Sequence, residues 1–196
     1  LLGAIVRAQR FAHSFPESYA WRMDIKKCFD SIHHGTLLQL LTRADIEPAA
    51  FALCKNIIES YHVSPGVGMP IGNLTSQIFA NIYLNELDRY ASHAVRPLKY
   101  LRYGDDAVFF FKSVTTAFFA RSTVSKFLKD SLHLTINQKN DIIVPIRRGI
   151  KFLGTWIYPA GRRLLARVRQ RIGANLCAAN VASYSGLIHH HDPKQQ

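Results

Sequence analysis

The order of apolar and polar positions predicts a strand near the start of the chain and a β-hairpin near its middle. Residues 19–25 alternate between apolar and polar side chains, which is typical of a half-buried strand. Residues 99–103 and 107–112 form two further strand-like runs with a short gap between them. Gly104, which opens this gap, suits the first positive-φ position of a primed hairpin turn. We therefore expect a tight hairpin, with the side chains that follow Gly104 projecting at its tip.

Other segments show helical spacing and complete a mixed α+β pattern. Helices are expected over residues 1–13, 36–41, 48–61 and 115–131, and a longer helix is expected to begin at Asn73. Short strands are expected at 134–136, 142–145 and 150–158.

The long helix that begins near Asn73 carries the most regular pattern. Asn73 or Thr75 is placed to cap it. Apolar positions recur every four residues and predict a buried face. The residues of this face are Leu74, Ile78, Ile82, Phe79, Tyr83 and Leu87. Gln77, Asn81 and Asn85 form a second stripe at the same interval, which is either the solvent-facing side or a row of amides that faces bases or sugars.

Composition narrows the class of protein. The 196 residues correspond to one domain or slightly more, and Lys plus Arg exceed Asp plus Glu by 25 to 13, leaving a net charge of +12. This balance favours a polyanionic partner, nucleic acid rather than a membrane. No apolar run reaches the ~18 residues that a spanning helix needs. The cysteines at 28, 54 and 177 lack metal-site spacing, and we expect them to be reduced in a cytoplasmic protein.

The adjacent carboxylates Asp105 and Asp106 are the first candidate chemistry. They adjoin an apolar strand that must be buried, where like charges repel and a cation relieves the repulsion. Mg²⁺ prefers oxygen ligands, and two such ions can hold the attacking and leaving oxygens of a phosphoryl transfer. Asp24, near the end of the first strand, would supply a third carboxylate if the two strands lie side by side.

Four motifs in this order resemble the palm motifs of bacterial reverse transcriptases. They are MDIKKCFDSIH at 23–33, GMPIGNLTSQ at 68–77, YGDD at 103–106 and FLG at 152–154. The likeness covers roughly residues 19–158. Ile71 and Gln77 stand where most reverse transcriptases have other residues, and they resemble the enzymes of diversity-generating retroelements.

The resemblance implies an α+β right-hand palm, with an antiparallel sheet packed on helices. Residues 1–161 are expected to form partial fingers and the palm, incomplete at the N-terminus. Residues 162–196 are expected to begin a basic helical thumb. The implied activity is RNA-directed DNA polymerisation by two-metal-ion phosphoryl transfer, error-prone if the retroelement type is right. Implied partners are an RNA template, a DNA or RNA primer, dNTPs and a small basic accessory protein.

The resemblance also assigns roles at the catalytic centre. Asp24, Asp105 and Asp106 would bind two Mg²⁺ ions, with Mn²⁺ as an alternative. Lys139 would act near the leaving pyrophosphate, where a cation or proton donor assists departure. A solvated surface lysine is the competing interpretation of Lys139.

Further residues are implied to contact nucleotide, primer or template. Phe29 would act as an aromatic gate that clashes with a ribose 2′-OH, and the alternative is ordinary core packing. The other implied nucleotide contacts are Ile25, Pro70, Ile71, Gly72 and Gln77. The implied primer and template contacts are Tyr103, Phe152, Leu153, Gly154, Arg167 and Arg169. Two alternatives stay open for these contacts. Residues 152–154 are also compatible with a plain buried strand, and Arg167 and Arg169 with a solvated basic helix face.

Three rival functions remain at this stage. Gly-Asp-Asp also occurs in viral RNA-dependent RNA polymerases; Phe29 argues against that class, whereas Asp30, six residues after Asp24, is compatible with it. A non-catalytic palm that only binds nucleic acid is the second rival. A metal-dependent nuclease would use the same carboxylates, but it gives no reason for Phe29 or for the glycine-rich loop before Asn73.

Overall fold

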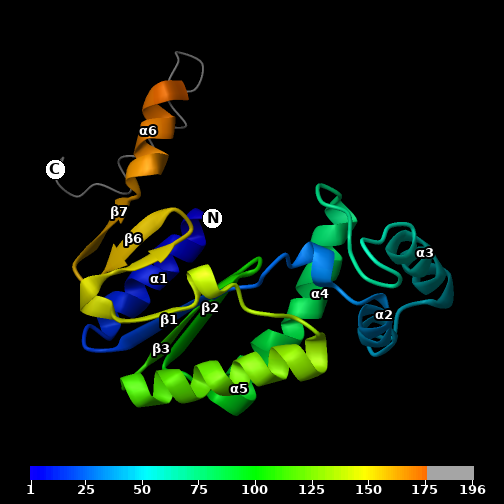
Figure 1. The fold of residues 1–196 in the computed structure, drawn as a ribbon, viewed down its shortest axis with the longest axis horizontal. Helices are drawn as coiled ribbons and strands as arrows, with labels where there is room; N and C mark the ends of the chain where they lie inside the picture. Colours follow the sequence, from blue (N-terminus) through cyan, green and yellow to red (C-terminus); the bar gives the residue numbers. More distant parts are fainter. Residues whose placement is uncertain (176–196) are drawn as a thin grey trace.

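A four-stranded antiparallel sheet forms the centre of the computed structural model, which describes residues 1–175 (Figure 1). The strand order is β2-β3-β1-β4. The strands are β1 (Tyr19–Asp24), β2 (Lys99–Tyr103), β3 (Asp106–Phe111) and β4 (Ile142–Pro145). All of β3 is buried between its two neighbours, which accounts for its uninterrupted apolar run.

The two faces of this sheet pack against different layers because successive side chains point to opposite sides. Trp21, Met23 and Phe109 share a core with helices α4 (Leu74–Tyr90) and α5 (Val114–Leu132). Ala20 and Phe110 face the other way, into a second core with helix α1 (Leu2–Ser14). The sheet is therefore covered on both faces.

A smaller sheet completes the second core. It has the order β5-β6-β7, with β5 at Ile150–Phe152, β6 at Thr155–Tyr158 and β7 at Gly161–Leu164. Helix α6 (Ala166–Asn175) follows β7 and projects away from the rest of the chain (Figure 1).

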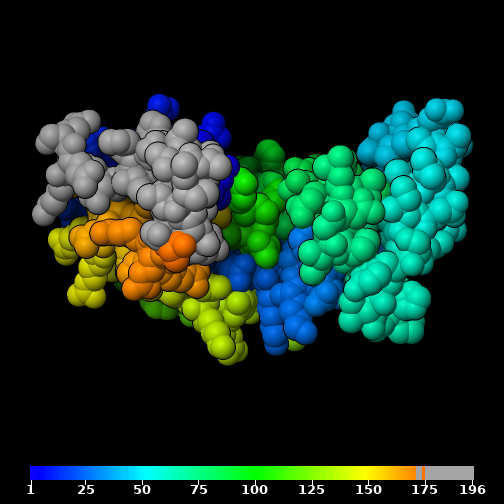
Figure 2. All heavy atoms as spheres, turned by 90° about the horizontal axis from the view of Figure 1, so that it is seen from above, coloured from blue at the N-terminus to red at the C-terminus, as the bar shows by residue number. Residues whose placement is uncertain are grey.

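Helices α2 (His34–Thr42) and α3 (Pro48–Glu59) form the opposite end of the molecule from α6, as Figure 2 shows from above. Short helical segments lie at Phe29–Ser31 (η1), Ala91–Val95 (η2), Gln138–Asn140 (η3) and Ile146–Arg148 (η4). Within residues 1–175, none of the helices combines the length and apolarity needed to cross a membrane. Cys28 and Cys54 are free thiols, and the cysteine at 177 lies outside the described residues.

Helix α4 confirms the predicted cap and part of the predicted buried face. The Asn73 side chain accepts a hydrogen bond from the Thr75 backbone N–H at 3.1 Å. Leu74 and Ile78, however, are 76% and 52% exposed. The other predicted residues are confirmed, because Phe79, Tyr83 and Leu87 are buried and Ile82 is partly buried. Leu74 and Ile78 have helical spacing too, and only the packing partners decide which of the spaced apolar residues are buried.

Three expectations about the strands are wrong in detail. Residues 150–158 form the β5–β6 hairpin, because Leu153 and Gly154 both adopt positive φ and turn the chain. Residues 134–136 form no named strand, and only Ile136 makes an isolated bridge, to Ile25. Residues 162–164, expected to begin the basic helical thumb, pair with β6 as part of strand β7.

Candidate active site

The β2–β3 hairpin carries two carboxylates at its tip. Tyr103 pairs with Asp106, so the loop between them consists of Gly104 and Asp105. Gly104 has φ +62° while Asp105 is not in the positive-φ region, as in a type II′ turn. The predicted primed turn is confirmed. It leaves Asp105 half-buried at the tip and makes Asp106 the first, buried residue of β3.

Strand β1 brings the third carboxylate to the same place. In the antiparallel β1–β3 pair, Asp24 lies directly opposite Asp106. The Ile25 backbone N–H donates to the Asp105 carbonyl oxygen at 3.2 Å, which extends the contact onto the turn. The expected juxtaposition of Asp24 with the acidic hairpin tip is therefore confirmed as geometry.

Two asparagine amides that sequence reasoning missed orient Asp24. Asn137 and Asn140 each donate from Nδ2 to Asp24 Oδ2 at 3.0 Å. The Asn137 backbone N–H also donates to the Asp24 carbonyl at 2.8 Å. Lys139 lies between these amides on η3, with an exposed side chain. The sequence signal that could have identified these amides was the presence of two asparagines on either side of Lys139, a residue already expected at the carboxylate site.

Arg22 is the second residue that sequence reasoning missed. Its Nε donates to Asp106 Oδ1 at 2.9 Å and its Nη2 to Asp106 Oδ2 at 2.7 Å. Arg22 shares a sheet face with Asp24 because the two are two residues apart on one strand. This alternation was visible in the sequence and puts Arg22 on the face of Asp24, but it does not say that Asp106 lies beside Arg22.

Arg102 anchors the turn to helix α4. One Nη donates to the Gly104 carbonyl at 2.8 Å, while Nε and the other Nη bind both carboxylate oxygens of Asp88. The Tyr100 hydroxyl donates to the same Asp88 carboxylate at 2.7 Å. The position of the carboxylate-bearing turn is thus tied to the helix behind the sheet.

Burial and mutual repulsion disfavour the charged forms of the hairpin carboxylates. Burial raises the pKa of Asp105, a backbone hydrogen bond opposes the rise, and the neighbouring Asp24 adds to it. Burial likewise raises the pKa of Asp106, Arg22 lowers it, and the charges of Asp24 and Asp105 raise it. A divalent cation bound by these carboxylates would relieve the repulsion. Their oxygen atoms are ligands of the kind that Mg²⁺ or Mn²⁺ takes. In residues 1–175 as arranged here, no three His, Cys, Asp or Glu side chains are gathered into a ready-made metal cluster.

The expected nucleotide-contacting residues lie in two settings. Phe29 is half-buried, and its carbonyl accepts from the Met69 N–H at 2.8 Å, which joins η1 to the glycine-rich loop. Ile71 is 78% exposed, and Gly72 and Gln77 are also exposed. Pro70 is partly buried. Ile25 is 2% exposed, so its side chain belongs to the core and only its backbone faces the turn.

The expected primer and template residues are distributed over the hairpins and α6. Tyr103 is 44% exposed beside the acidic turn. Phe152 is fully buried, and Leu153 and Gly154 form the turn after it. Arg167 and Arg169 are both exposed on α6.

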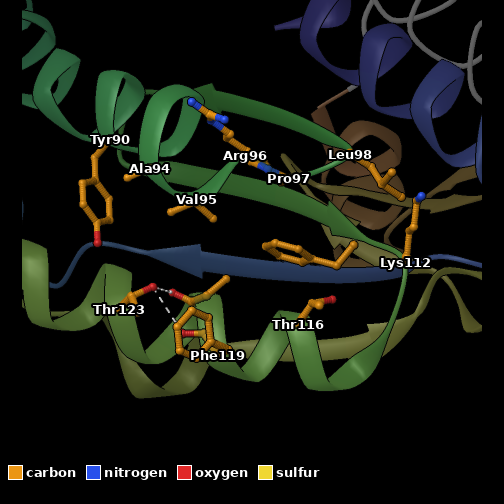
Figure 3. Close-up of a pocket in the computed structure, with 12 residues that line it drawn as sticks. Tyr90, Ala94, Val95, Arg96, Pro97, Leu98, Lys112, Thr116, Phe119 and Thr123 are labelled. Atoms are coloured by element: carbon orange, nitrogen blue, oxygen red, sulfur yellow. Dashed lines mark hydrogen bonds between the residues drawn. The ribbon is translucent and has the colours of Figure 1, made fainter.

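A separate cavity of about 520 Å³ lies at the other end of the central sheet (Figure 3). It includes Phe111, which pairs with Tyr19 at the start of β1, whereas the carboxylates lie at the end of β1. Arg96, Lys112 and the exposed Phe119 also line it, and no carboxylate does. This cavity is therefore not part of the acidic site.

Several solved structures have a similar fold. Telomerase from Candida tropicalis with a TWJ fragment of telomeric RNA matches with a TM-score of 0.63 and 15% identity, over 81% of this chain and 32% of that one. The foamy viral protease-reverse transcriptase with an RNA/DNA hybrid matches with a TM-score of 0.52 and 18% identity, over 86% of this chain and 20% of that one. The fold is that of a polymerase palm with part of the fingers.

Sequence comparison places the chain within one family of that class. Residues 9–157 match the family described as reverse transcriptase (RNA-dependent DNA polymerase), and the chain belongs to this family. It is 27% identical to Protein YkfC of Escherichia coli K12, over 67% of this chain and 44% of YkfC. It is 36% identical to an uncharacterized 91 kDa protein in the cob intron of Schizosaccharomyces pombe, over 34% of this chain and 9% of that protein. The chain thus spans less than half the length of these relatives.

Proposed function

We propose that this protein is an RNA-directed DNA polymerase that adds dNTPs to a primer 3′-OH on an RNA template. The observation that carries the proposal is the register that sets Asp24 opposite Asp106, with Asp105 in the adjoining turn. Membership of the reverse transcriptase family supports it. A nuclease could use the same carboxylates, but the family match and the palm fold favour polymerisation.

Asp24, Asp105 and Asp106 are the residues that would hold divalent cations in this proposal. When bound, two Mg²⁺ ions, or Mn²⁺ in their place, activate the primer hydroxyl and neutralise charge on the triphosphate. Asn137 and Asn140 keep Asp24 oriented through their amide hydrogen bonds. The exposed ammonium of Lys139 stabilises the negative charge that develops on the departing pyrophosphate.

The remaining assigned residues bind nucleotide, primer and template. Phe29 excludes the ribose 2′-OH by steric contact, and the exposed loop that includes Ile71 lines the nascent base pair. The β5–β6 turn, with Gly154, approaches the primer. Arg167 and Arg169 bind phosphates without reading base sequence. We assign residues 1–161 to the fingers and palm, and α6 to the beginning of the thumb.

A finer assignment is the error-prone, bacterial enzyme type of diversity-generating retroelements, acting in the cytoplasm with a small basic accessory protein. The retroelement type is supported by Ile71 and Gln77, both exposed in or just after the glycine-rich loop. The cytoplasmic location is supported by the free thiols of Cys28 and Cys54. Sequencing of cDNA made from a defined RNA template tests this assignment. Uniform accuracy at every template base would contradict it.

Primer extension on an RNA template tests the polymerase itself. Asp105→Asn is expected to reduce dNTP incorporation by about 10²-fold or more, because metal-ion catalysis contributes several kcal/mol to the barrier. The matched control is Asp130→Asn, since Asp130 is an exposed carboxylate of α5 paired with Lys126. The control is expected to extend primers normally.

Two results would contradict the proposal. Equal extension by Asp105→Asn and the unmodified protein would remove the carboxylate site from the reaction. Extension with rNTPs as efficient as with dNTPs would favour an RNA polymerase instead. Both substrates are therefore offered to both variants in the same assay.

A further inference from the structure

The guanidinium of Arg22 neutralises one of the three carboxylates that strand pairing and the hairpin turn bring to this end of the sheet. Its guanidinium binds both oxygens of Asp106, at 2.9 and 2.7 Å. The exposed fractions of the two side chains are 16% and 12%, so water screens the pair only weakly. The positive charge of Arg22 thus lies where the repulsion among Asp24, Asp105 and Asp106 would otherwise be unrelieved.

Two other arginine–aspartate pairs in the described residues differ in one respect. Asp88 binds Arg102 and also accepts the Tyr100 hydroxyl. Asp141 binds Arg121 and also accepts the Trp21 indole N–H at 2.8 Å. Each of these carboxylates has a neutral aromatic donor that holds it in place.

Asp106 has a simpler set of donors. The side-chain hydrogen bonds that the described residues make to it come from Arg22. A flexible arginine side chain can withdraw from a carboxylate without unfolding a strand, whereas a tyrosine or tryptophan embedded in the core cannot. Withdrawal of Arg22 would therefore leave Asp106 without a side-chain donor from the described residues, whereas Asp88 and Asp141 would each keep an aromatic donor.

We propose that Arg22 is a positioning residue that holds Asp106 while no divalent cation is bound and competes with the cation for that carboxylate. This inference rests on the proposed function, because it takes the carboxylate cluster to be the cation site. Asn137 and Asn140 already orient Asp24. The rearrangement that accompanies cation binding is therefore the replacement of Arg22 by the cation at Asp106. Arg22 sets the cation concentration at which the site fills.

Mn²⁺ binding to the protein without nucleic acid tests this inference, measured by electron paramagnetic resonance of free Mn²⁺. Arg22→Gln is expected to lower the half-saturating Mn²⁺ concentration by about tenfold, the factor that corresponds to losing a competing charge-assisted pair. Arg22→Lys keeps the charge but loses the two-pronged contact, and a smaller decrease is expected. Arg121→Gln is the matched control, and its half-saturation is expected to be unchanged.

Thermal unfolding provides a second measurement that does not depend on activity. Without divalent cation, Arg22→Gln is expected to melt at a lower temperature than the unmodified protein, because the carboxylates then repel one another. Added Mn²⁺ is expected to raise its melting temperature by more than it raises that of the unmodified protein. Circular dichroism confirms that each variant is folded before titration.

The outcomes separate the two proposals. An unchanged or increased half-saturating concentration in Arg22→Gln overturns the role of Arg22, and the polymerase proposal stands if Asp105→Asn still abolishes primer extension. If the folded proteins bind no Mn²⁺, or if Asp105→Asn does not remove the binding, the role of Arg22 is also overturned. If Asp105→Asn also extends primers normally, the polymerase proposal falls with it.

Discussion

Phe29 follows Asp24 by five residues and lies half-buried in η1, where its backbone contacts the glycine-rich loop. If its ring contacts the sugar of an incoming nucleotide, a smaller side chain leaves room for the 2′-OH. Phe29→Val is therefore expected to reduce the preference for dNTPs over rNTPs by roughly 10-fold to 100-fold, the range of steric discrimination for small groups. Single-nucleotide incorporation kinetics with both substrates measure this preference.

The control for Phe29 is another half-buried phenylalanine. Phe127 stacks on Tyr90 at a centroid distance of 4.1 Å, between α5 and α4. Phe127→Val is expected to leave the substrate preference unchanged while it lowers stability. If Phe29→Val kept the full preference for dNTPs, core packing would be the better interpretation of this side chain.

The three aspartates were predictable from sequence, but their polar neighbours were not. Adjacent carboxylates next to an apolar strand are unusual in a chain with few acids, so Asp105 and Asp106 stood out. Arg22 and Asn137 are ordinary residues until the strand register brings them to the site. Side-chain partners more than 80 residues apart, such as Arg22 and Asp106, carry no local signal.

At the scale of elements, the turn before β5 depends on Gly149. This residue has φ 81° and ψ 152°, a region that is nearly exclusive to glycine. A Cβ at this position would also overlap the ring of Tyr158. Gly149→Ala is expected to lower the free energy of unfolding by about 1–3 kcal/mol. Urea unfolding followed by circular dichroism measures the change.

Gly35 offers a matched glycine-to-alanine control. It lies in α2, and a Cβ there meets no atom within 4 Å. Gly35→Ala is expected to stabilise the protein by roughly 0.5–1 kcal/mol, because alanine favours the helix. A Gly149→Ala protein as stable as the unmodified one would contradict the strained-turn argument.

Elements were predicted well where the local pattern has one solution and less well where it has two. The hairpin with Gly104 and the capped helix that begins at Leu74 appear as expected. The predicted face of α4 was wrong at Leu74 and Ile78, because these two residues have the same spacing as the residues that are buried. The break in 150–158 was missed because Leu153 is rarely found at positive φ.

At the scale of the whole molecule, the net charge of +12 predicts salt-sensitive binding to nucleic acid. The affinity for an RNA/DNA hybrid is expected to fall linearly on a plot of log affinity against log salt concentration. Arg167→Ala and Arg169→Ala are each expected to reduce the slope by about one, since each removes one phosphate contact. Fluorescence anisotropy over a series of salt concentrations measures the slope.

A basic residue at the other end of the molecule provides the control. Lys55 is half exposed on α3, where it lies 4.0 Å from Glu59. Lys55→Ala is expected to leave the slope unchanged. Equal slopes for all variants would show that α6 does not contact the phosphates.

The sequence by itself determined the class of fold, the acidic turn and the family, because these depend on residue order, turn chemistry and motifs that are local in the chain. Only the tertiary structure decided which of the spaced apolar residues of α4 are buried and which donors bind the carboxylates. It also separated the carboxylate end of the sheet from the cavity at its other end. The physical reason is that strand register and helix packing are set by contacts between distant segments, which no local pattern specifies.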